Sequence, residues 1–448
     1  MEKRIEQVVK KFIEKIGSKE VYLISHYDTD GITSAAIMIK TLKKLDVPFT
    51  VQIINNLEEK IIQKLPKDKI IVFLDLASGS LNYISKSKLQ DVFIIDHHEI
   101  IQEIPEEINI INPQLDNKES ISSSGLTYLF CKKILKNNNE DKKLAKLAIL
   151  GMVGDSLEKN IDKINSKIID DNEIIKKRGL LLYPSTRPIN RVLEFSSNPY
   201  IPGVTGDTRG TLELLRETGL TPKNGKYKSI IELNEIEMTK LVTSILLKVP
   251  KKKHEEIIGD IFLIKLFNKL EDARELSAVI NACSRLGEPE TAIQVCLEIS
   301  EAKKRAESLH AKNRRQIISG LEFISNSENS DKIEGKGYVI INAKNNIRET
   351  IIGTIASIIS NSDIYEYGTI IITMAHYNDS QNKKIKVSAR TVGKNGRNVR
   401  EILNNTITKI GGEVGGHEFA AGAIINHDKE QEFIINLKKN LEIEVVKV

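Results

Sequence analysis

Residues 21–31 have the sequence VYLISHYDTDG and indicate most directly how this chain folds. The first five residues are mostly apolar, which is typical of a buried β-strand. His26, Asp28 and Asp30 follow at alternate positions, and side chains two residues apart in extended backbone share a face. Gly31 then permits a tight turn into a helix. The stretch therefore predicts polar side chains that point into one space at the end of a strand.

The same arrangement recurs further along the chain. The apolar runs IIVFLD and VFIID end at Asp75 and Asp96, and His97 and His98 directly follow the second run. Segments with helical periodicity separate these runs, and this alternation predicts an α/β domain with a doubly wound, largely parallel sheet. Asp155 follows a glycine-bracketed turn, GMVGDS. Because ligands collect at the carboxyl ends of the strands in such sheets, we expect these residues to converge.

A set of acids and histidines in this arrangement suits metal chemistry. Hard divalent cations prefer carboxylate oxygens, and imidazole ligands shift the preference toward manganese-like ions. Two cations about 4 Å apart activate a water molecule and neutralise the charge that develops on a phosphodiester. An isolated acid after a strand is usually a helix cap, so no single residue decides the question. The joint pattern favours a two-metal hydrolase that uses Mn2+, or alternatively Mg2+.

The chain of 448 residues is long enough for several domains. Residues 1–160 are expected to form the metal-binding core, and 161–325 a helical insertion with a connecting helix. The polar stretch 326–336 is expected to be a linker. Strands and helices then alternate again over residues 337–448, which predicts a smaller C-terminal α/β domain across a cleft.

Composition narrows the compartment and the partners. Three cysteines without paired spacing argue against disulfides and favour a reduced, cytoplasmic compartment. No apolar run approaches the about 18 residues that span a membrane, so no membrane partner is expected. The net charge of +5 permits an anionic partner. Aromatic residues make up only 5% of the chain, which argues against binding that stacks many bases on aromatic side chains.

Several motifs resemble those of a known family. HYDTDG, the strand end at Asp75, DHH at 96–98 and GMVGD resemble, in this order, the four motifs of the DHH phosphoesterase superfamily. GGEVGGHEFAAG resembles the motif of the associated DHHA1 domain. LSAVINACSRLG is similar to a segment of RecJ exonucleases, although Ser284 stands where glycine is common. RPINRVLEFSSNPYIPGVTGDTRG is similar to archaeal RecJ-like nucleases, and the apparent lack of the oligonucleotide-binding domain of bacterial RecJ points the same way.

The resemblance implies two metal ions that share one bridging carboxylate. The ligands of the first ion would be His26, Asp28 and Asp75. The ligands of the second ion would be Asp30, Asp75, His97 and Asp155. Asp96 would orient a histidine, as carboxylates beside metal ligands commonly do, and His98 would face the scissile phosphate. The catalytic group implied in this way is Asp75, Asp96, His97 and His98.

The same resemblance implies residues that grip the substrate. They are Arg285, Arg390 and the turn formed by Gly415, Gly416 and His417. Adjacent glycines let backbone amides approach a phosphate closely, which is a physical reason for the turn. The alternative for Arg285 is a salt bridge on a helix surface, and the glycine pair has the alternative of an ordinary turn. The serines at 122–124 suit either a phosphate site at a helix N-terminus or a plain helix cap.

Three functions are compatible with these features. The first is a RecJ-like exonuclease that degrades single-stranded DNA, or RNA, from an end, with the family favouring 5′ to 3′ digestion in replication or repair. The second is a phosphodiesterase for short oligoribonucleotides or cyclic dinucleotides, although such enzymes are usually shorter than 448 residues. The third is a scaffold associated with the replicative helicase, with GINS or other replisome proteins as partners. Because every expected metal ligand is present, a scaffold role alone would not explain the sequence, and a scaffold that retains nuclease activity remains an alternative.

Overall fold

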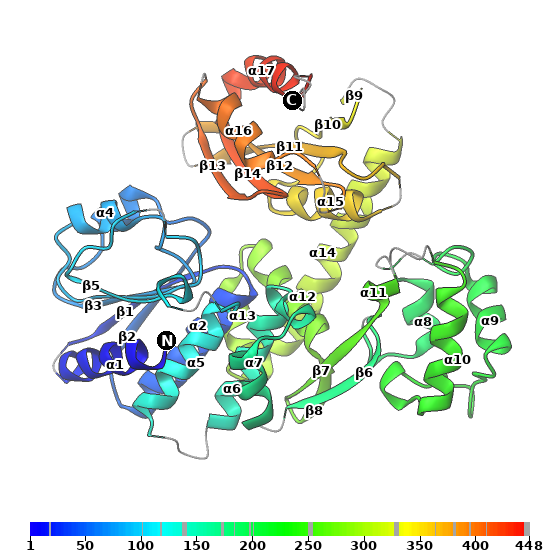
Figure 1. Cartoon of the computed structure of the whole chain (residues 1–448), viewed down its shortest axis with the longest axis horizontal. Coiled ribbons are helices and arrows are strands. Elements are labelled where there is room, and N and C mark those ends of the chain that lie inside the picture. Colours follow the sequence, from blue (N-terminus) through cyan, green and yellow to red (C-terminus); the bar gives the residue numbers. More distant parts are fainter. Residues whose placement is uncertain are drawn as a thin grey trace. The chain divides into compact units, whose positions relative to one another are not determined.

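A computed structural model describes residues 1–442 with short gaps (Figure 1). The gaps are residues 18, 101, 117–118, 137–140, 172–173, 183, 197–198, 200, 250–253, 327–330, 363, 380–381, 394–395 and 409. The chain divides into two compact units, Met1–His310 and Ala311–Val448. Among the described residues, no helix combines the length and the apolar character required to cross a membrane.

A five-stranded parallel sheet forms the centre of the first unit, in the order β2-β1-β3-β4-β5. The strands are β1 Val21–His26, β2 Phe49–Ile54, β3 Ile70–Leu74, β4 Val92–Ile95 and β5 Ile108–Ile111. Every residue of β3 and β4 is buried, which explains their uninterrupted apolar sequences. The doubly wound, parallel sheet predicted from the sequence is therefore confirmed, with β5 as a further strand that was not predicted.

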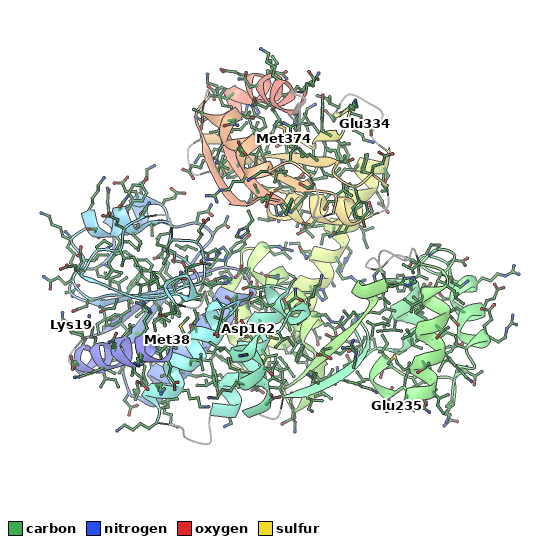
Figure 2. The ribbon with its side chains drawn as sticks, in the orientation of Figure 1. Lys19, Met38, Asp162, Glu235, Glu334 and Met374 are labelled. Atoms are coloured by element: carbon green, nitrogen blue, oxygen red, sulfur yellow. The ribbon has the colours of Figure 1, made fainter. Side chains whose placement is uncertain are left out.

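Helices cover both faces of this sheet (Figure 1). Leu23 and Val72 point to one face, and Ile24 and Phe73 point to the other, as the alternation of side chains along a strand requires. The helices packed with the first face are α1 Glu2–Ile16, α2 Thr29–Lys44, α5 Ser123–Ile134 and α6 Asp141–Gly154. Those packed with the second face are α3 Glu59–Gln63 and α4 Leu81–Lys86. Met38 of α2 is fully buried in the first of these two cores (Figure 2).

The rest of the first unit is mainly helical but contains a small sheet. Its helices are α7 Lys163–Asp171, α8 Ile189–Glu194, α9 Thr208–Glu217, α10 Glu235–Leu246, α11 His254–Ile257, α12 Ala273–Arg285 and α13 Pro289–Cys296, with short η1 Pro113–Leu115, η2 Leu157–Lys159 and η3 Ile230–Glu232. The antiparallel strands β6 Ile175–Leu180, β7 Ile258–Leu266 and β8 Lys269–Asp272 were not predicted. β6 has the sequence IKKRGL, which lacks apolar alternation, so its pairing with β7 identifies it as a strand.

A 27-residue helix, α14 Ser300–Asn326, begins in the first unit and ends in the second. Its length agrees with the connecting helix expected at the end of the 161–325 region. The expected linker at 326–336 is described only in part, because residues 327–330 lie outside the described residues. β9 Lys332–Gly335 occupies much of the remainder, so this part of the expected linker is a strand.

The second unit contains a six-stranded mixed sheet, in the order β13-β14-β12-β11-β10-β9. Its other strands are β10 Tyr338–Asn342, β11 Ile370–Asp379, β12 Asn382–Thr391, β13 Glu413–His417 and β14 Ala420–Asn426. One face packs against α15 Glu349–Asn361, and the other packs against α16 Val399–Ile407 and α17 Glu430–Glu442, which follows η5 His427–Lys429. Met374 of β11 is fully buried on the α16–α17 side (Figure 2). The predicted C-terminal α/β domain is confirmed, but β9, β13 and β14 were not predicted.

Candidate metal centre

The acids and histidines singled out in the first unit converge at one edge of the parallel sheet. His26 ends β1, Asp75 follows β3, and Asp96 and His97 follow β4. Because β1, β3 and β4 are adjacent and parallel, their carboxyl ends bring these residues together. The predicted convergence of the strand ends therefore agrees with the described geometry.

Asp155 reaches the same place by a different route from the one predicted. The GMVG sequence expected to form a turn lies in the last turn of α6, so the prediction of a glycine turn was wrong. Gly151 and Gly154 instead allow close helix packing. A Cβ atom on Gly154 would lie 2.8 Å from Cβ of Thr29 in α2, and Gly151 faces Thr33 and Asp30 in the same way. Asp155 is delivered by this helix contact.

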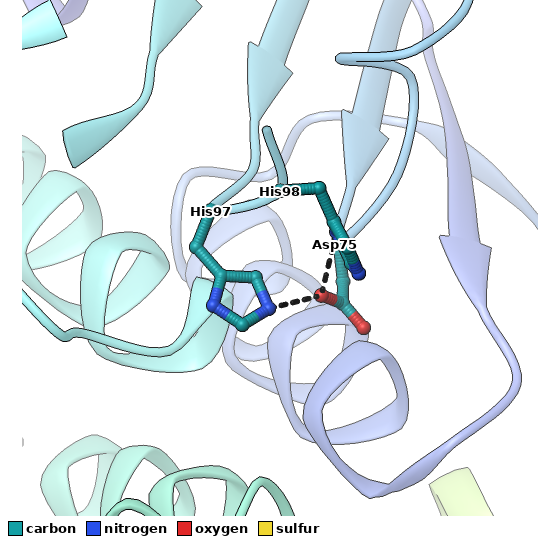
Figure 3. Close-up of side chains that lie close together, drawn as sticks. All are labelled: Asp75, His97 and His98. Carbon is teal, nitrogen blue, oxygen red and sulfur yellow. Dashed lines mark ion pairs between the residues drawn. The ribbon is translucent and has the colours of Figure 1, made fainter. Parts of the chain in front are cut away.

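Asp75 lies at the centre of the cluster. Its Oδ2 is 3.3 Å from Nδ1 of His26. Its Oδ1 is 3.5 Å from Nε2 of His97 (Figure 3). Nε2 of His97 is also 3.5 Å from Oδ2 of Asp155, and Nδ1 of His26 is 3.0 Å from Oδ2 of Asp28. Each oxygen of Asp75 thus faces a different histidine, and each histidine has a second carboxylate beside it.

Potential ligand atoms form two main groups around Asp75. Members of each group place ligand atoms within 4.8 Å of one another, and the groups are His26, Asp28, Asp75 and Asp30, His97, Asp155. A third, overlapping group is Asp75, His97 and His98 (Figure 3). The backbone of Asp75 has a φ of 60°, a left-handed conformation that is uncommon for residues other than glycine. Such strain is typical of residues whose side chains are held in place for function.

Hydrogen bonds hold the carboxylates in position. Asp30 is fully buried and accepts the backbone N–H groups of Ser123 at 2.6 Å and Ser124 at 3.0 Å. The N-terminus of α5 therefore binds Asp30, while Ser122 caps the helix by accepting the N–H of Gly125. Of the two interpretations of this serine cluster, the helix cap agrees with the structure. The helix N-terminus and its dipole stabilise the negative charge of Asp30.

Asp96 holds His98. Its Oδ1 lies 2.7 Å from Nδ1 of His98, and its Oδ2 accepts the backbone N–H of Ser78 at 2.9 Å. Asn112, which follows β5, donates to the backbone oxygen of His98 at 2.9 Å and to Oγ of Ser78 at 2.9 Å. Asn112 was missed from the sequence because β5 was not predicted, although the polar residue after the apolar run INII was a usable signal. The histidine that Asp96 orients is therefore His98.

The carboxylates of this cluster repel one another. Burial raises the pKa of Asp75 well above its usual value, and neighbouring Asp28 and Asp30 raise it further. Burial also raises the pKa of Asp155, with added repulsion from Asp30 and Asp75. Burial by itself would lower the pKa of His26, but Asp28 outweighs this effect and the pKa rises to about 9. The cluster therefore retains protons that a bound cation would replace.

Two further observations test whether a divalent cation fits. Oδ1 of Asp75 and Oδ2 of Asp155 are buried but have no hydrogen-bond partner among the described residues. Unsatisfied buried carboxylate oxygens are costly, and a cation is the partner that would satisfy both. Asp28 and His98 have 36% and 44% of their side chains exposed, so the cluster is open on one side. The residues present thus fit divalent cations and leave access for a substrate.

Three family models match successive parts of the chain. They are the DHH family N-terminal domain at residues 20–152, the DHH-CID domain at 182–257 and the DHHA1 domain at 335–442. The chain belongs to the DHH/DHHA1 family. The first model covers the strands that carry His26, Asp75 and His97. The resemblance inferred from the DHH and GGH motifs is therefore confirmed.

Other proteins resemble this DHH/DHHA1 protein along its whole length. An uncharacterised protein of Methanocaldococcus jannaschii is 28% identical over 457 residues, which cover 96% of each chain. The RecJ structure in complex with Mn2+ from Thermus thermophilus has a TM-score of 0.61 at 16% identity, and the match covers 99% of this chain and 55% of that chain. CDC45 from Entamoeba histolytica has a TM-score of 0.67 at 12% identity, with 98% and 99% covered. These likenesses show that the chain has the fold shared by RecJ and CDC45.

The RecJ-like segment LSAVINACSRLG of this DHH/DHHA1 protein forms most of α12, which contacts the metal centre. Oδ1 of Asn281 accepts the backbone N–H of Thr29 at 3.1 Å, and Oγ1 of Thr29 donates to the backbone oxygen of Ser277 at 3.1 Å. Thr29 lies between Asp28 and Asp30, so α12 supports the backbone that carries two metal-ligand candidates. Arg285 is the half-buried last residue of the same helix.

The substrate-binding candidates of the DHHA1 domain lie on β12 and β13, the two strands that flank β14. Ala420 of β14 pairs with Arg390 of β12 on one side and with His417 of β13 on the other. The GGH sequence is part of a strand, so the prediction that it forms a turn was wrong. Gly416 has a φ of 120°, and a Cβ atom there would lie 2.5 Å from the backbone oxygen of Ala420. Only glycine fits this close approach of two strands.

The guanidinium of Arg390 donates hydrogen bonds to other residues of the DHHA1 domain. Its Nε donates to Oγ of Ser357 at 3.0 Å, and its Nη1 donates to the backbone oxygens of Ala389 at 2.8 Å and Ala421 at 3.3 Å. Burial lowers the pKa of the Arg390 guanidinium below its usual value. These bonds fix the orientation of the guanidinium and leave Nη2 as the nitrogen most able to meet a phosphate.

Proposed function

We propose that this chain is a two-metal phosphodiester hydrolase that degrades single-stranded DNA from an end. The observation that carries the proposal is the position of Asp75, whose two oxygens face two separate histidine–carboxylate groups. A bridging carboxylate in this position would hold two cations close together, as in-line phosphodiester hydrolysis requires. The RecJ-like fold agrees with a nuclease, and the manganese in the matched RecJ structure agrees with this cofactor.

In this proposal the two ions would be held as the family resemblance implies. The first ion would have His26, Asp28 and Asp75 as ligands. The second ion would have Asp30, Asp75, His97 and Asp155 as ligands. When bound, the ions supply an activated water molecule and neutralise charge on the phosphate. We propose Mn2+ as the preferred ion because the site combines imidazole with carboxylate, although carboxylates also accept Mg2+.

The chain's own residues have separate tasks in the proposed reaction. Burial by itself would lower the pKa of His98, but the hydrogen bond to Asp96 and the negative charge of Asp96 together outweigh burial, so the pKa is raised. Protonated His98 would donate a hydrogen bond to an oxygen of the scissile phosphate. Arg285, Arg390 and the segment 415–417 would contact other phosphates of the strand. Contacts of this kind carry no base information, so we propose weak sequence preference and binding that weakens as salt rises.

The experiment that tests this function uses end-labelled oligonucleotides. Single-stranded DNA, single-stranded RNA and blunt duplex DNA are incubated with Mn2+, Mg2+ or EDTA, and 5′-blocked and 3′-blocked strands give the direction. We expect digestion of single-stranded DNA with Mn2+, slower attack on duplex, and inhibition by a blocked 5′ end. A closed single-stranded circle is the matched control and should resist digestion. Cleavage of the circle would contradict an end-dependent exonuclease.

One observation favours a second candidate, a replisome scaffold. The match to CDC45 has a TM-score of 0.67 and spans 98% of this chain and 99% of the CDC45 chain. A scaffold with this fold would bind replication proteins such as GINS, and hydrolysis would be secondary or absent. Folded, manganese-loaded protein that binds a GINS-type partner but leaves every oligonucleotide intact would favour the scaffold. Rapid hydrolysis confined to dinucleotides would instead favour the phosphodiesterase for short substrates.

A further inference from the structure

A second group of metal-ligand side chains lies in the Ala311–Val448 unit, separate from the centre around Asp75. Its members are His376 on β11, His427 on η5 and Glu430 at the start of α17. One ligand atom of each residue lies within 4.8 Å of those of the other two. The whole chain has only eight histidines, and two of them meet here beside a carboxylate. Such a combination is much more specific than a surface cluster of acids.

The three side chains are held in place by the sheet. Nε2 of His376 lies 2.6 Å from Oε2 of Glu430, and these side chains are 12% and 14% exposed. Asn342 of β10 donates to Oε1 of Glu430 at 2.6 Å, which directs the other oxygen toward the histidines. The backbone N–H of His376 donates to the oxygen of Lys344 at 2.8 Å. Outer hydrogen bonds that orient a ligating carboxylate are a common feature of metal sites.

The arrangement of the histidines also fits a shared ion. The rings of His376 and His427 have centroids 4.6 Å apart and an interplanar angle of 72°. A hydrogen bond between His376 and Glu430 accounts for two of the three residues but gives His427 no role. The nearby cation Lys344 forms an ion pair with Asp331, so that charge is already balanced by another carboxylate. The position next to both imidazoles suits a cation that accepts nitrogen ligands.

The group lies away from the GGH segment within the same sheet. Strand β14 begins at Ala420, which pairs with His417, and ends at Asn426, the residue before His427. At about 3.3 Å per residue, its two ends are separated by about 20 Å. An ion at His427 would therefore not touch a phosphate bound by the GGH segment. It would instead join the start of α17 to the central strands β10 and β11.

We propose that His376, His427 and Glu430 bind one divalent ion of the zinc class, with water as a fourth ligand. Zinc takes nitrogen and carboxylate ligands at about 2.0–2.2 Å in a tetrahedron, so neighbouring ligand atoms are about 3.4 Å apart. The separation of 2.6 Å between His376 and Glu430 would therefore widen slightly on binding. Two imidazoles also favour zinc over manganese at this site. This inference does not depend on the proposed nuclease function.

The test measures zinc directly in the full-length protein. Metal is removed with a chelator, and zinc bound after equilibrium dialysis is counted by mass spectrometry for the wild type, His427→Asn and His376→Asn. His254→Asn is the matched control, because Nε2 of His254 lies 3.0 Å from the backbone oxygen of Val249 and has no role in the group. We expect each of the first two variants to lose one zinc ion per chain, and the control to lose none.

A second measurement distinguishes a metal site from a folding defect. The rise in Tm on adding zinc should be smaller in His427→Asn than in the wild type, whereas the Tm values without zinc should be similar. With manganese at the same concentration in place of zinc, the rise in Tm should be equal in the wild type and in His427→Asn. Equal zinc content in the wild type and in both variants would overturn the proposal. An equal zinc-dependent rise in Tm would overturn it as well.

Discussion

Gly151→Ala tests whether close helix packing positions the metal centre. A Cβ atom on Gly151 would stand 2.7 Å from Oγ1 of Thr33, and closer still to Oγ of Ser124 and Oδ1 of Asp30. Non-bonded heavy atoms settle at about 3.5 Å or more, so these atoms would have to move by roughly 1 Å. Asp30 and Ser124 would move together, because the backbone N–H of Ser124 donates to Asp30. The substitution therefore displaces a candidate metal ligand without removing it.

The expected cost has two parts. Overpacking a buried site usually lowers the free energy of unfolding by about 1–3 kcal/mol. A misplacement of about 1 Å at a catalytic centre costs about 10²-fold in rate. That factor corresponds to about 2.7 kcal/mol in the activation barrier. We therefore expect Gly151→Ala to fold, to bind Mn2+ more weakly and to hydrolyse single-stranded DNA about 100-fold more slowly than the wild type.

The measurements are manganese titration by calorimetry, thermal unfolding and the rate on an end-labelled oligonucleotide. Gly17→Ala is the matched control, because Gly17 has a φ of −64° and a Cβ atom there meets nothing within 4 Å. This control should leave stability within about 0.5 kcal/mol of the wild type and leave the rate unchanged. Wild-type manganese affinity and wild-type rate in Gly151→Ala would refute the reasoning that α6 packing positions Asp30.

Three further predictions follow from the same geometry. Asp75→Asn removes the negative charge of the carboxylate whose two oxygens face His26 and His97, so hydrolysis should fall at least about 10³-fold while circular dichroism shows an intact fold. Near-normal turnover would exclude a bridging role. The folded-state pKa of His26 is raised from 6.5 to about 9, so its contribution to stability is present below pH 6.5 and lost as pH rises through 9. Chelator-treated protein should therefore unfold at lower urea concentration at pH 9 than at pH 6.5, and the opposite trend would contradict this pKa shift. Asn281→Ala leaves the backbone N–H of Thr29 without its acceptor and should lower the free energy of unfolding, measured by urea titration, by about 1–3 kcal/mol. Asn281→Asp retains an acceptor oxygen, so its free energy of unfolding should fall by less. An equal fall in both variants would contradict the role of this hydrogen bond.

The sequence alone was sufficient for the elements whose burial follows a simple pattern. β1, β3 and β4 are short apolar runs ended by polar residues, and α1 has apolar residues at helical spacing. Burial on one or both faces of an element determines which of its positions are apolar, so the spacing of apolar residues along the sequence predicts whether the element is a strand or a helix. The same local pattern located Asp75 and His97 at strand ends, and parallel strand ends converge in every sheet of this class.

Tertiary structure decided the features that depend on partners far apart in the chain. β6 and β13 lack apolar alternation and are strands because β7 and β14 pair with their backbones. The GMVG sequence has glycines that are typical of a turn, yet it is helical because its glycines admit the close approach of α2. A local pattern cannot distinguish these outcomes, because glycine permits a turn and a close helix contact equally well.

Some roles of the site residues could likewise be predicted from the sequence, whereas others depend on the tertiary structure. The sequence placed His26, Asp75 and Asp155 in one site from their positions after apolar strands and after a glycine-rich segment, and the family resemblance then assigned them to two metal ions. It contained no sign that Asn281 accepts a hydrogen bond from Thr29, 252 residues away, or that His427 meets His376. Hydrogen bonds and ligand groups depend on distances of a few ångströms between side chains. Those distances are set by the packing of whole elements, because the free energy of burying their apolar faces outweighs any single polar contact.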